Sequence, residues 1–488
     1  MALSGKMASG AFWSIVEKGG QQAISFLVFM VLARLVGPEE YGLANICFVY
    51  FLLAGIIVWG VVDGIVSLQV EDDERLSSLF WFTQVIGVVL AAFCVGTAGV
   101  LANLLEQPKL EAILYTFAVV PLLLSLSAVP NMIVMKAMNF KIYAIRTLVA
   151  TLVGGGVGLW LAFKGFGAYA IVWQQIAFYV VMNLIIWPFA NWRPRLKFSR
   201  TSLVDAVKPG LNAIKVSSLA YFEQQFPRLV IADVIGAGAL GHYAFVMRIR
   251  LALQEMLITA PLVVLYPGMS KMKGNRPDQA RIAGKALLLA CSFLFPLLAI
   301  LAATAPLYIP FVFGERWEPS IVLLQIYAIG AAALPFNFVV KELFRANNRL
   351  NIFFRYNMLV TLLSLATLFL LPLQDGLRLM ALSVTTIAFA AIPLYVHCVR
   401  RCLDIGLWSE VARIWPFAVA SVLTFVAIVA AESGALHTVN LASIPLQLVL
   451  FGGLGAAIFV GCALLLGKTQ AVEVITLLRS ARARPSAP

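Results

Sequence analysis

Long apolar segments alternate with short charged segments along nearly the whole chain, from about residue 11 to residue 466. A helix that crosses a bilayer needs about 20 mostly apolar residues. Fourteen segments meet this length, near residues 11–35, 44–68, 78–102, 112–134, 143–163, 167–190, 210–235, 241–266, 283–311, 319–340, 352–373, 378–399, 412–431 and 443–466. The pattern predicts an all-α polytopic membrane protein with about fourteen transmembrane helices.

Composition excludes a soluble enzyme. The 488 residues are 61% hydrophobic and 12% charged, whereas a typical soluble chain is roughly 45–50% apolar and about 25% charged. Of the 36 Lys and Arg residues, 26 lie in loops, tails or span ends on the side of the N-terminus, 5 lie in loops or span ends on the opposite side, and 5 lie deeper within the predicted spans. Cytoplasmic loops collect such residues, so we expect both termini in the cytoplasm, and the net charge of +13 does not indicate nucleic acid.

Two pairs of segments indicate an internal repeat. Leu32–Gly42 (LARLVGPEEYG) and Ile231–Gly241 (IADVIGAGALG) match with an offset of 199, which aligns Gly37 with Gly236 and Gly42 with Gly241. Pro130–Lys136 matches Pro335–Lys341 at proline and lysine with an offset of 205. Each pair joins spans six apart, which makes the repeats parallel. We therefore expect two six-helix lobes related by a pseudo-twofold axis, 1–205 and 206–400, followed by two further helices and a basic tail in 401–488.

Charged side chains within the predicted spans are candidates for function, because each costs roughly 2.5–3.5 kcal/mol at the centre of a membrane helix. The basic ones are Lys18, Lys215, Arg228, Arg248 and Arg250. We expect them to line a cavity between the lobes and bind a phosphate-bearing headgroup, for which arginine offers bidentate contacts. The alternative is structural pairing with buried carboxylates, since Arg248 and Glu255 are seven residues apart and share a helix face.

Acidic and polar residues of the same spans form two further candidate sets. The carboxylates that could couple transport to H⁺ or Na⁺ are Glu17, Asp63, Glu223 and Glu255, with structural pairing as the alternative. The candidate glycan contacts are Gln21, Gln22, Tyr221, Gln224 and Gln225, with hydrogen bonds between packed helices as the alternative. No GxxxxGK(S/T) loop is present, and the three histidines are dispersed, so we expect no cofactor and no metal.

Three motifs resemble the polysaccharide transporter (oligosaccharide flippase) family. They are LARLVGPEEYG, the Val312–Pro319 segment with its FGxxW turn, and Ile235-Gly236 with Gly241-His242-Tyr243. One departure is Pro227 followed by Arg228, where members of that family often carry aspartate. Physically, Gly37 suits a left-handed helix cap and Pro38 cannot continue the helix, so the first motif predicts a helix stop without a ligand role.

The resemblance implies a transporter rather than an enzyme. Its expected activity is to move polyprenyl-diphosphate-linked oligosaccharide repeat units across the bacterial inner membrane by alternating access, for lipopolysaccharide or exopolysaccharide synthesis. Expected partners are membrane lipid and the polysaccharide polymerase and chain-length machinery. Two alternatives stay open: a cation-coupled multidrug extruder of the same superfamily, which the basic set disfavours, and a membrane glycan polymerase, which the short outer loops disfavour.

Overall fold

The computed structural model describes residues 2–66, 73–199, 203–204, 221, 225–259, 262, 265–370, 376–433 and 444–483. All regular elements in these ranges are helical. Eleven helical segments within them are long and apolar enough to cross a membrane, and each overlaps a predicted span. The all-α membrane class is confirmed. The total of fourteen stays a prediction, because the spans expected near 210–235, 241–266 and 352–373 have no counterpart among the eleven.

The chain forms two compact units, Met1–Ala244 (unit 1) and Phe245–Pro488 (unit 2). This division separates the two parts of the chain whose residues contact mainly one another. The expected lobes, 1–205 and 206–400 with the segment 401–488, follow the repeat instead and stay a prediction.

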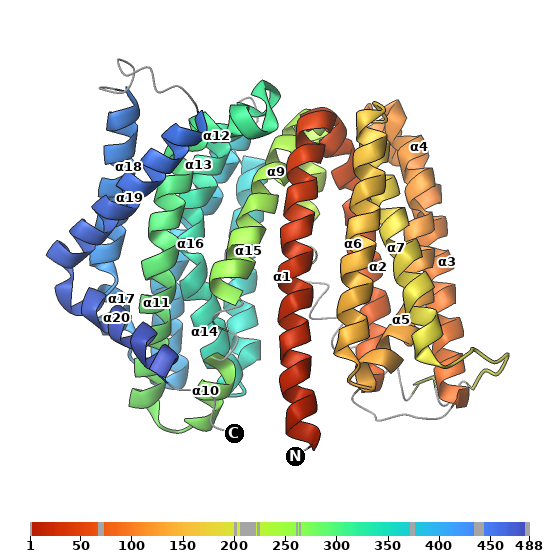
Figure 1. Ribbon diagram of the computed structural model, residues 1–488, viewed down its shortest axis with the longest axis horizontal. Coiled ribbons are helices and arrows are strands. Elements are labelled where there is room, and N and C mark those ends of the chain that lie inside the picture. The colour runs from red at the N-terminus through yellow and green to blue at the C-terminus, as the bar shows by residue number, and fades with distance from the viewer. Residues whose placement is uncertain are drawn as a thin grey trace. The chain divides into compact units, whose positions relative to one another are not determined.

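Unit 1 contains long helices that pack lengthwise (Figure 1). In chain order they are α1 (Ala2–Val36), α2 (Pro38–Val66), α3 (Asp73–Leu104), α4 (Pro108–Phe117), α5 (Val119–Lys136), α6 (Phe140–Phe163) and α7 (Ala168–Ala190), and α9 (Ala237–Gln254) begins in this unit. α6 packs along both α1 and α7. A Cβ at Gly155 would lie 2.6 Å from the Val28 side chain of α1, and one at Gly154 would lie 2.8 Å from the Gln174 carbonyl oxygen of α7. These glycines therefore allow close helix packing, as in many membrane proteins.

Unit 2 contains the remaining elements (Figure 1). They are η1 (Glu255–Thr259), α10 (Leu265–Lys271), α11 (Arg276–Ala303), α12 (Ala305–Tyr308), η3 (Ile309–Phe313), η4 (Glu315–Trp317), α13 (Ser320–Ala331), α14 (Leu334–Ala346), α15 (Leu350–Leu370), α16 (Gly376–Leu403), α17 (Trp408–Ala412), α18 (Trp415–Ser433), α19 (Ile444–Leu466) and α20 (Lys468–Ala483). The main apolar core of the unit takes side chains from α11, α14 and α16.

The helix stop expected at the first motif is confirmed. α1 ends at Val36, Gly37 has a φ of 81°, and α2 begins at Pro38. Its repeat partner Gly236 has a φ of 105° directly before α9. Both positions take the left-handed conformation that glycine adopts without steric cost.

The FGxxW turn also has a packing role. Gly314, with a φ of 97°, separates η3 from η4, and this turn directs Trp317 into the interior, where it is fully buried. The Trp317 ring stacks on Phe245 with centroids 4.5 Å apart, and Phe313 meets Phe245 edge-on at 4.7 Å. The motif therefore joins the start of unit 2 to its η3–η4 turn by aromatic packing.

Candidate functional site

A polar network connects α1 and α6 inside unit 1. The Thr147 hydroxyl donates to Glu17 Oε1 at 2.9 Å, and Arg146 Nη2 donates to Thr147 Oγ1 at 3.2 Å. Both helices are among the eleven segments long and apolar enough to cross a membrane. The network thus brings a carboxylate and a guanidinium together through one hydroxyl, in a region where unpaired charge is costly.

Arg146, the cation of this network, is deeply buried, with only 2% of the residue exposed. Its guanidinium carbon lies 3.8 Å from the centroid of the Tyr143 ring, a cation–π contact. Arg146 Nε and Nη1 have no hydrogen-bond partner among the described residues. Two guanidinium nitrogens of a buried arginine, which together carry three N–H donors, are therefore left over after the contacts to Thr147 and Tyr143 are counted.

Arg146 is a site residue that the sequence interpretation missed, because it was counted among the cytoplasmic loop charges. α6 begins at Phe140, which places Arg146 about 9 Å along the helix at 1.5 Å per residue. The available signal was Glu17, a carboxylate within an apolar helix that needs a partner.

Glu17 and Lys18 are adjacent in sequence but differ in their surroundings. Glu17 is half-buried on the α6 side, whereas Lys18 is exposed within unit 1, as are Phe12 and Ile15. Successive residues on a helix are separated by about 100°, which explains the difference. Gln21 and Gln22 of the same helix are half-buried.

Four candidate residues lie wholly or partly outside the described part of the chain. Lys215, Glu223 and Gln224 lie outside the described residues, and so does the side chain of Asp63 in α2. The candidate roles of these four residues stay predictions.

The described part of the next segment contains three further candidates. The Tyr221 hydroxyl donates to the Val49 carbonyl oxygen of α2 at 2.9 Å. A hydrogen bond to a neighbouring helix was the expected alternative to a glycan contact for this residue. Gln225 is 1% exposed, and neither of its amide atoms has a hydrogen-bond partner in the described part of the chain. Arg228 is half-buried, with a buried Nε that likewise finds no partner there.

The other basic candidates belong to unit 2. Arg248 and Arg250 are half-buried on α9, and Glu255 is exposed at the start of η1. No ion pair joins Arg248 to Glu255, although both residues are described. The predicted basic set is thus divided between the units, and its convergence on one cavity stays a prediction.

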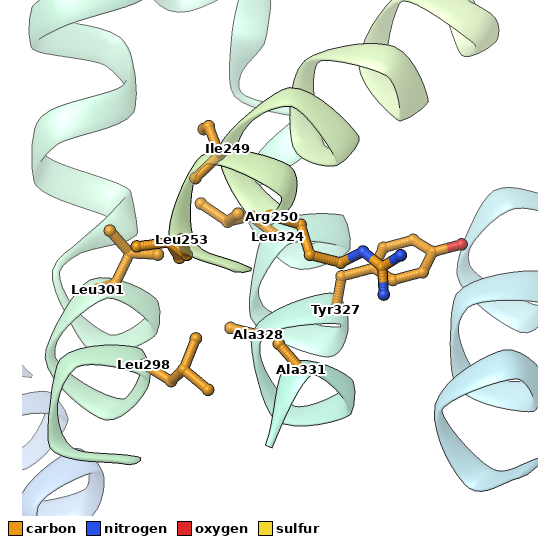
Figure 2. A pocket seen from close by; sticks show the side chains of 9 residues that line it. All are labelled: Ile249, Arg250, Leu253, Leu298, Leu301, Leu324, Tyr327, Ala328 and Ala331. Carbon is orange, nitrogen blue, oxygen red and sulfur yellow. The ribbon is translucent and has the colours of Figure 1, made fainter. Parts of the chain in front are cut away.

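Arg250 lines a small pocket of unit 2 (Figure 2). The other lining residues are Ile249, Leu253, Leu298, Leu301, Leu324, Tyr327, Ala328 and Ala331. Figure 2 shows the guanidinium of Arg250 and the ring of Tyr327 extending to the same side, away from Leu298 and Leu301. The surface of the pocket is therefore apolar, and the charged end of Arg250 and the hydroxyl of Tyr327 extend away from it.

The two glycine-containing motifs meet each other within unit 1. A Cβ at Gly42 would lie 1.9 Å from the Ala237 carbonyl oxygen, and a Cβ at Gly241 would lie 1.8 Å from the Pro38 carbonyl oxygen. The contact is reciprocal, because Ala237 is the repeat equivalent of Pro38 and Gly241 that of Gly42. The N-terminal turns of α2 and α9 thus touch backbone to backbone.

Comparison with known proteins gives the family. The family model described as "Polysaccharide biosynthesis protein" matches residues 31–322, which is more than half of the chain. The chain belongs to the polysaccharide biosynthesis protein family. This assignment agrees with the resemblance of the sequence motifs.

Two curated relatives are similar to this member of the polysaccharide biosynthesis protein family. The succinoglycan biosynthesis transport protein ExoT of Rhizobium meliloti (strain 1021) is 25% identical over 326 residues, which are 66% of this chain and 65% of ExoT. The lipopolysaccharide biosynthesis protein WzxC of Escherichia coli (strain K12) is 23% identical over 367 residues, 74% of each chain. The match thus spans a little under two thirds of ExoT and about three quarters of WzxC.

Solved structures share the fold of this family member. The lipid II flippase MurJ in an inward closed conformation has a TM-score of 0.74 at 14% identity. The match covers 93% of this chain and 98% of the MurJ chain. An inward-facing multidrug resistance MATE family transporter has a TM-score of 0.59 at 15% identity. The match covers 86% of this chain and 99% of the transporter chain. The chain therefore has the helical fold of these membrane transporters.

Proposed function

We propose that this protein is a flippase that moves polyprenyl-diphosphate-linked oligosaccharide repeat units across the bacterial inner membrane for surface polysaccharide synthesis. Membership of the polysaccharide biosynthesis protein family carries the proposal, together with the eleven apolar helical segments found among the described residues. The names of ExoT and WzxC, which refer to succinoglycan transport and lipopolysaccharide biosynthesis, support the class of cargo. Both termini lie in the cytoplasm on this proposal.

The chemistry of the cargo explains why charge inside the membrane is needed. The unaided headgroup would lose its hydrogen bonds to water in hydrocarbon. The basic side chains of the predicted set supply positive charge for the diphosphate, and polar side chains supply hydrogen bonds for the sugars. Alternating access, the general scheme for transporters built from two repeats, moves the head while the tail stays in the bilayer. Membrane lipid, the polymerase and the chain-length machinery are its partners.

The coupling ion is H⁺ or Na⁺ in this proposal. Glu17 is the described coupling candidate that is held in a polar network, through Thr147 and Arg146. Transport should therefore respond to an imposed H⁺ or Na⁺ gradient. Glu17→Gln should remove this response but preserve the transport that is measured in the absence of a gradient. A response that survives the substitution would exclude Glu17 as the coupling group.

A liposome assay tests the function directly. The purified protein is reconstituted with a polyprenyl-diphosphate oligosaccharide that carries a fluorophore on its glycan, and an impermeant quencher is added outside. Protein-free liposomes should keep about half of the fluorescence, and an active flippase should expose the remainder with time. Protein that stays folded but leaves the inner half protected would refute the proposal. Ethidium efflux from the same preparation would then favour the multidrug extruder.

A further inference from the structure

The last helix, α20, differs from the bundle helices in its direction. It follows α19 after Gly467 and packs against α19 and α11. Figure 1 shows α20 crossing the ends of the unit 2 helices at a wide angle to α19. α19 is one of the helices long enough to span a membrane. Because α20 begins two residues after α19 ends, it starts at the level where the polypeptide leaves the membrane.

One face of α20 is fixed to unit 2. Val474 is only 8% exposed and packs at the edge of the unit 2 core. Glu473 forms an ion pair with Arg413, which also pairs with Glu410. These contacts determine which face of α20 points away from the protein.

The outward face has a basic–apolar–apolar–basic stripe. Lys468, Val472, Ile475 and Arg479 are spaced i, i+4, i+7 and i+11, so they align on one side of the helix. All four are exposed, with 51% of Val472 and 44% of Ile475 accessible. A helix side that faces only water would gain nothing from two large exposed aliphatic residues between its charges.

Exposed tryptophans place the same region at interfacial depth. Trp408 and Trp415 are 46% and 53% exposed and are the first residues of α17 and α18, respectively. They flank Arg413, the residue that holds α20 through Glu473. Tryptophan is enriched at the boundary between headgroups and acyl chains, so an α20 held beside them lies at the same boundary.

We propose that α20 is a membrane-surface helix whose exposed stripe binds anionic phospholipid headgroups. Val472 and Ile475 enter the boundary between headgroups and acyl chains. Lys468 and Arg479 extend from the two ends of the stripe to lipid phosphates, as long basic side chains do at membrane surfaces. Charge complementarity selects anionic lipid, because Arg413 neutralises the acidic residue of α20, Glu473, and leaves the exposed charges basic.

Spin labels test the position of the helix. In full-length protein whose six native cysteines are replaced, single cysteines are introduced as Val472→Cys, Ile475→Cys and, as control, Thr469→Cys, which is exposed about 90° from the stripe. The ratio of collisions with oxygen to collisions with a water-soluble nickel chelate should be several-fold higher at the first two positions than at the control. Equal ratios would place the stripe in water and overturn the proposal. Protection from both reagents would mean that protein covers the stripe, which also overturns it.

Lipid dependence tests the headgroup contact. Unfolding temperatures are compared in phosphatidylcholine nanodiscs with and without phosphatidylglycerol. The stabilisation by phosphatidylglycerol should fall by half or more in Lys468→Gln/Arg479→Gln. It should be kept in the matched variant Lys271→Gln/Lys273→Gln, which removes two exposed lysines at the end of α10 and in the turn that follows it. Full retention in the stripe variant would refute anionic headgroup binding.

Discussion

The contact between the N-terminal turns of α2 and α9 makes a steric prediction for Gly42→Ala. The added methyl group would lie 1.9 Å from the Ala237 carbonyl oxygen, whereas real Cβ atoms essentially never approach a heavy atom within 3.0 Å. The neighbour is backbone, so no side-chain rotation relieves the clash and the two turns must separate by more than about 1 Å. Overpacking of this kind costs about 1–3 kcal/mol.

Gly241→Ala makes the reciprocal clash, 1.8 Å from the Pro38 carbonyl oxygen, and should be similarly harmful. Because one separation of the turns relieves both clashes, the double variant should lose less stability than the two single variants together.

Gly238→Ala provides the matched control. This residue lies in the same turn of α9, but a Cβ there would have no heavy atom within 4 Å. Replacing a helical glycine by alanine otherwise stabilises by up to about 1 kcal/mol, so the control should unfold at or slightly above the wild-type temperature. Thermal unfolding in detergent measures all four variants. If Gly42→Ala and Gly238→Ala behave alike, the backbone contact is not present in the protein and the reasoning fails.

Three further predictions concern charge and packing. Arg146→Met should lower the unfolding temperature, and adding Glu17→Gln should recover part of the loss because the carboxylate then no longer needs a cation; additive losses in the double-mutant cycle would contradict this. Arg248→Ala with Arg250→Ala should leave the protein folded but stop glycan export, and normal surface polysaccharide from a well-expressed double variant would exclude these residues from binding. Trp317→Ala should cost about 3–5 kcal/mol of unfolding free energy, since the ring is fully buried against Phe245; a loss below about 1 kcal/mol would contradict the packing role.

Membrane helices and their ends were predictable because hydropathy and backbone chemistry act locally. The span expected at 443–466 is observed as Ile444–Leu466, and Gly37 ends α1 as its sequence context predicts. Gly154 and Gly155 approach α7 and α1 closely, as small residues at membrane-helix interfaces commonly do.

The polar site was harder to predict, because a side chain's surroundings depend on which way its helix faces. Arg146 lies near a helix end, where a lysine or arginine more often reflects topology than a site, and only the partner helix reveals that it points inward. Glu17 and Lys18 illustrate the same dependence on helix orientation. A helix separates these adjacent positions by about 100°, so Glu17 is half-buried against α6 while Lys18 is exposed within unit 1.

The reciprocal glycine contact bears on the repeat itself. Similar apolar sequences arise by chance and give no reason for the two copies to touch. Across a twofold axis, in contrast, a residue i that contacts j is matched by the equivalent of i contacting the equivalent of j. Gly42 against Ala237 and Gly241 against Pro38 satisfy this relation at the offset of 199. This reciprocity agrees with the predicted pseudo-twofold repeat, whose axis would then pass between residues 38–42 and 237–241. The close backbone contact itself explains why both Gly42 and Gly241 lack a side chain.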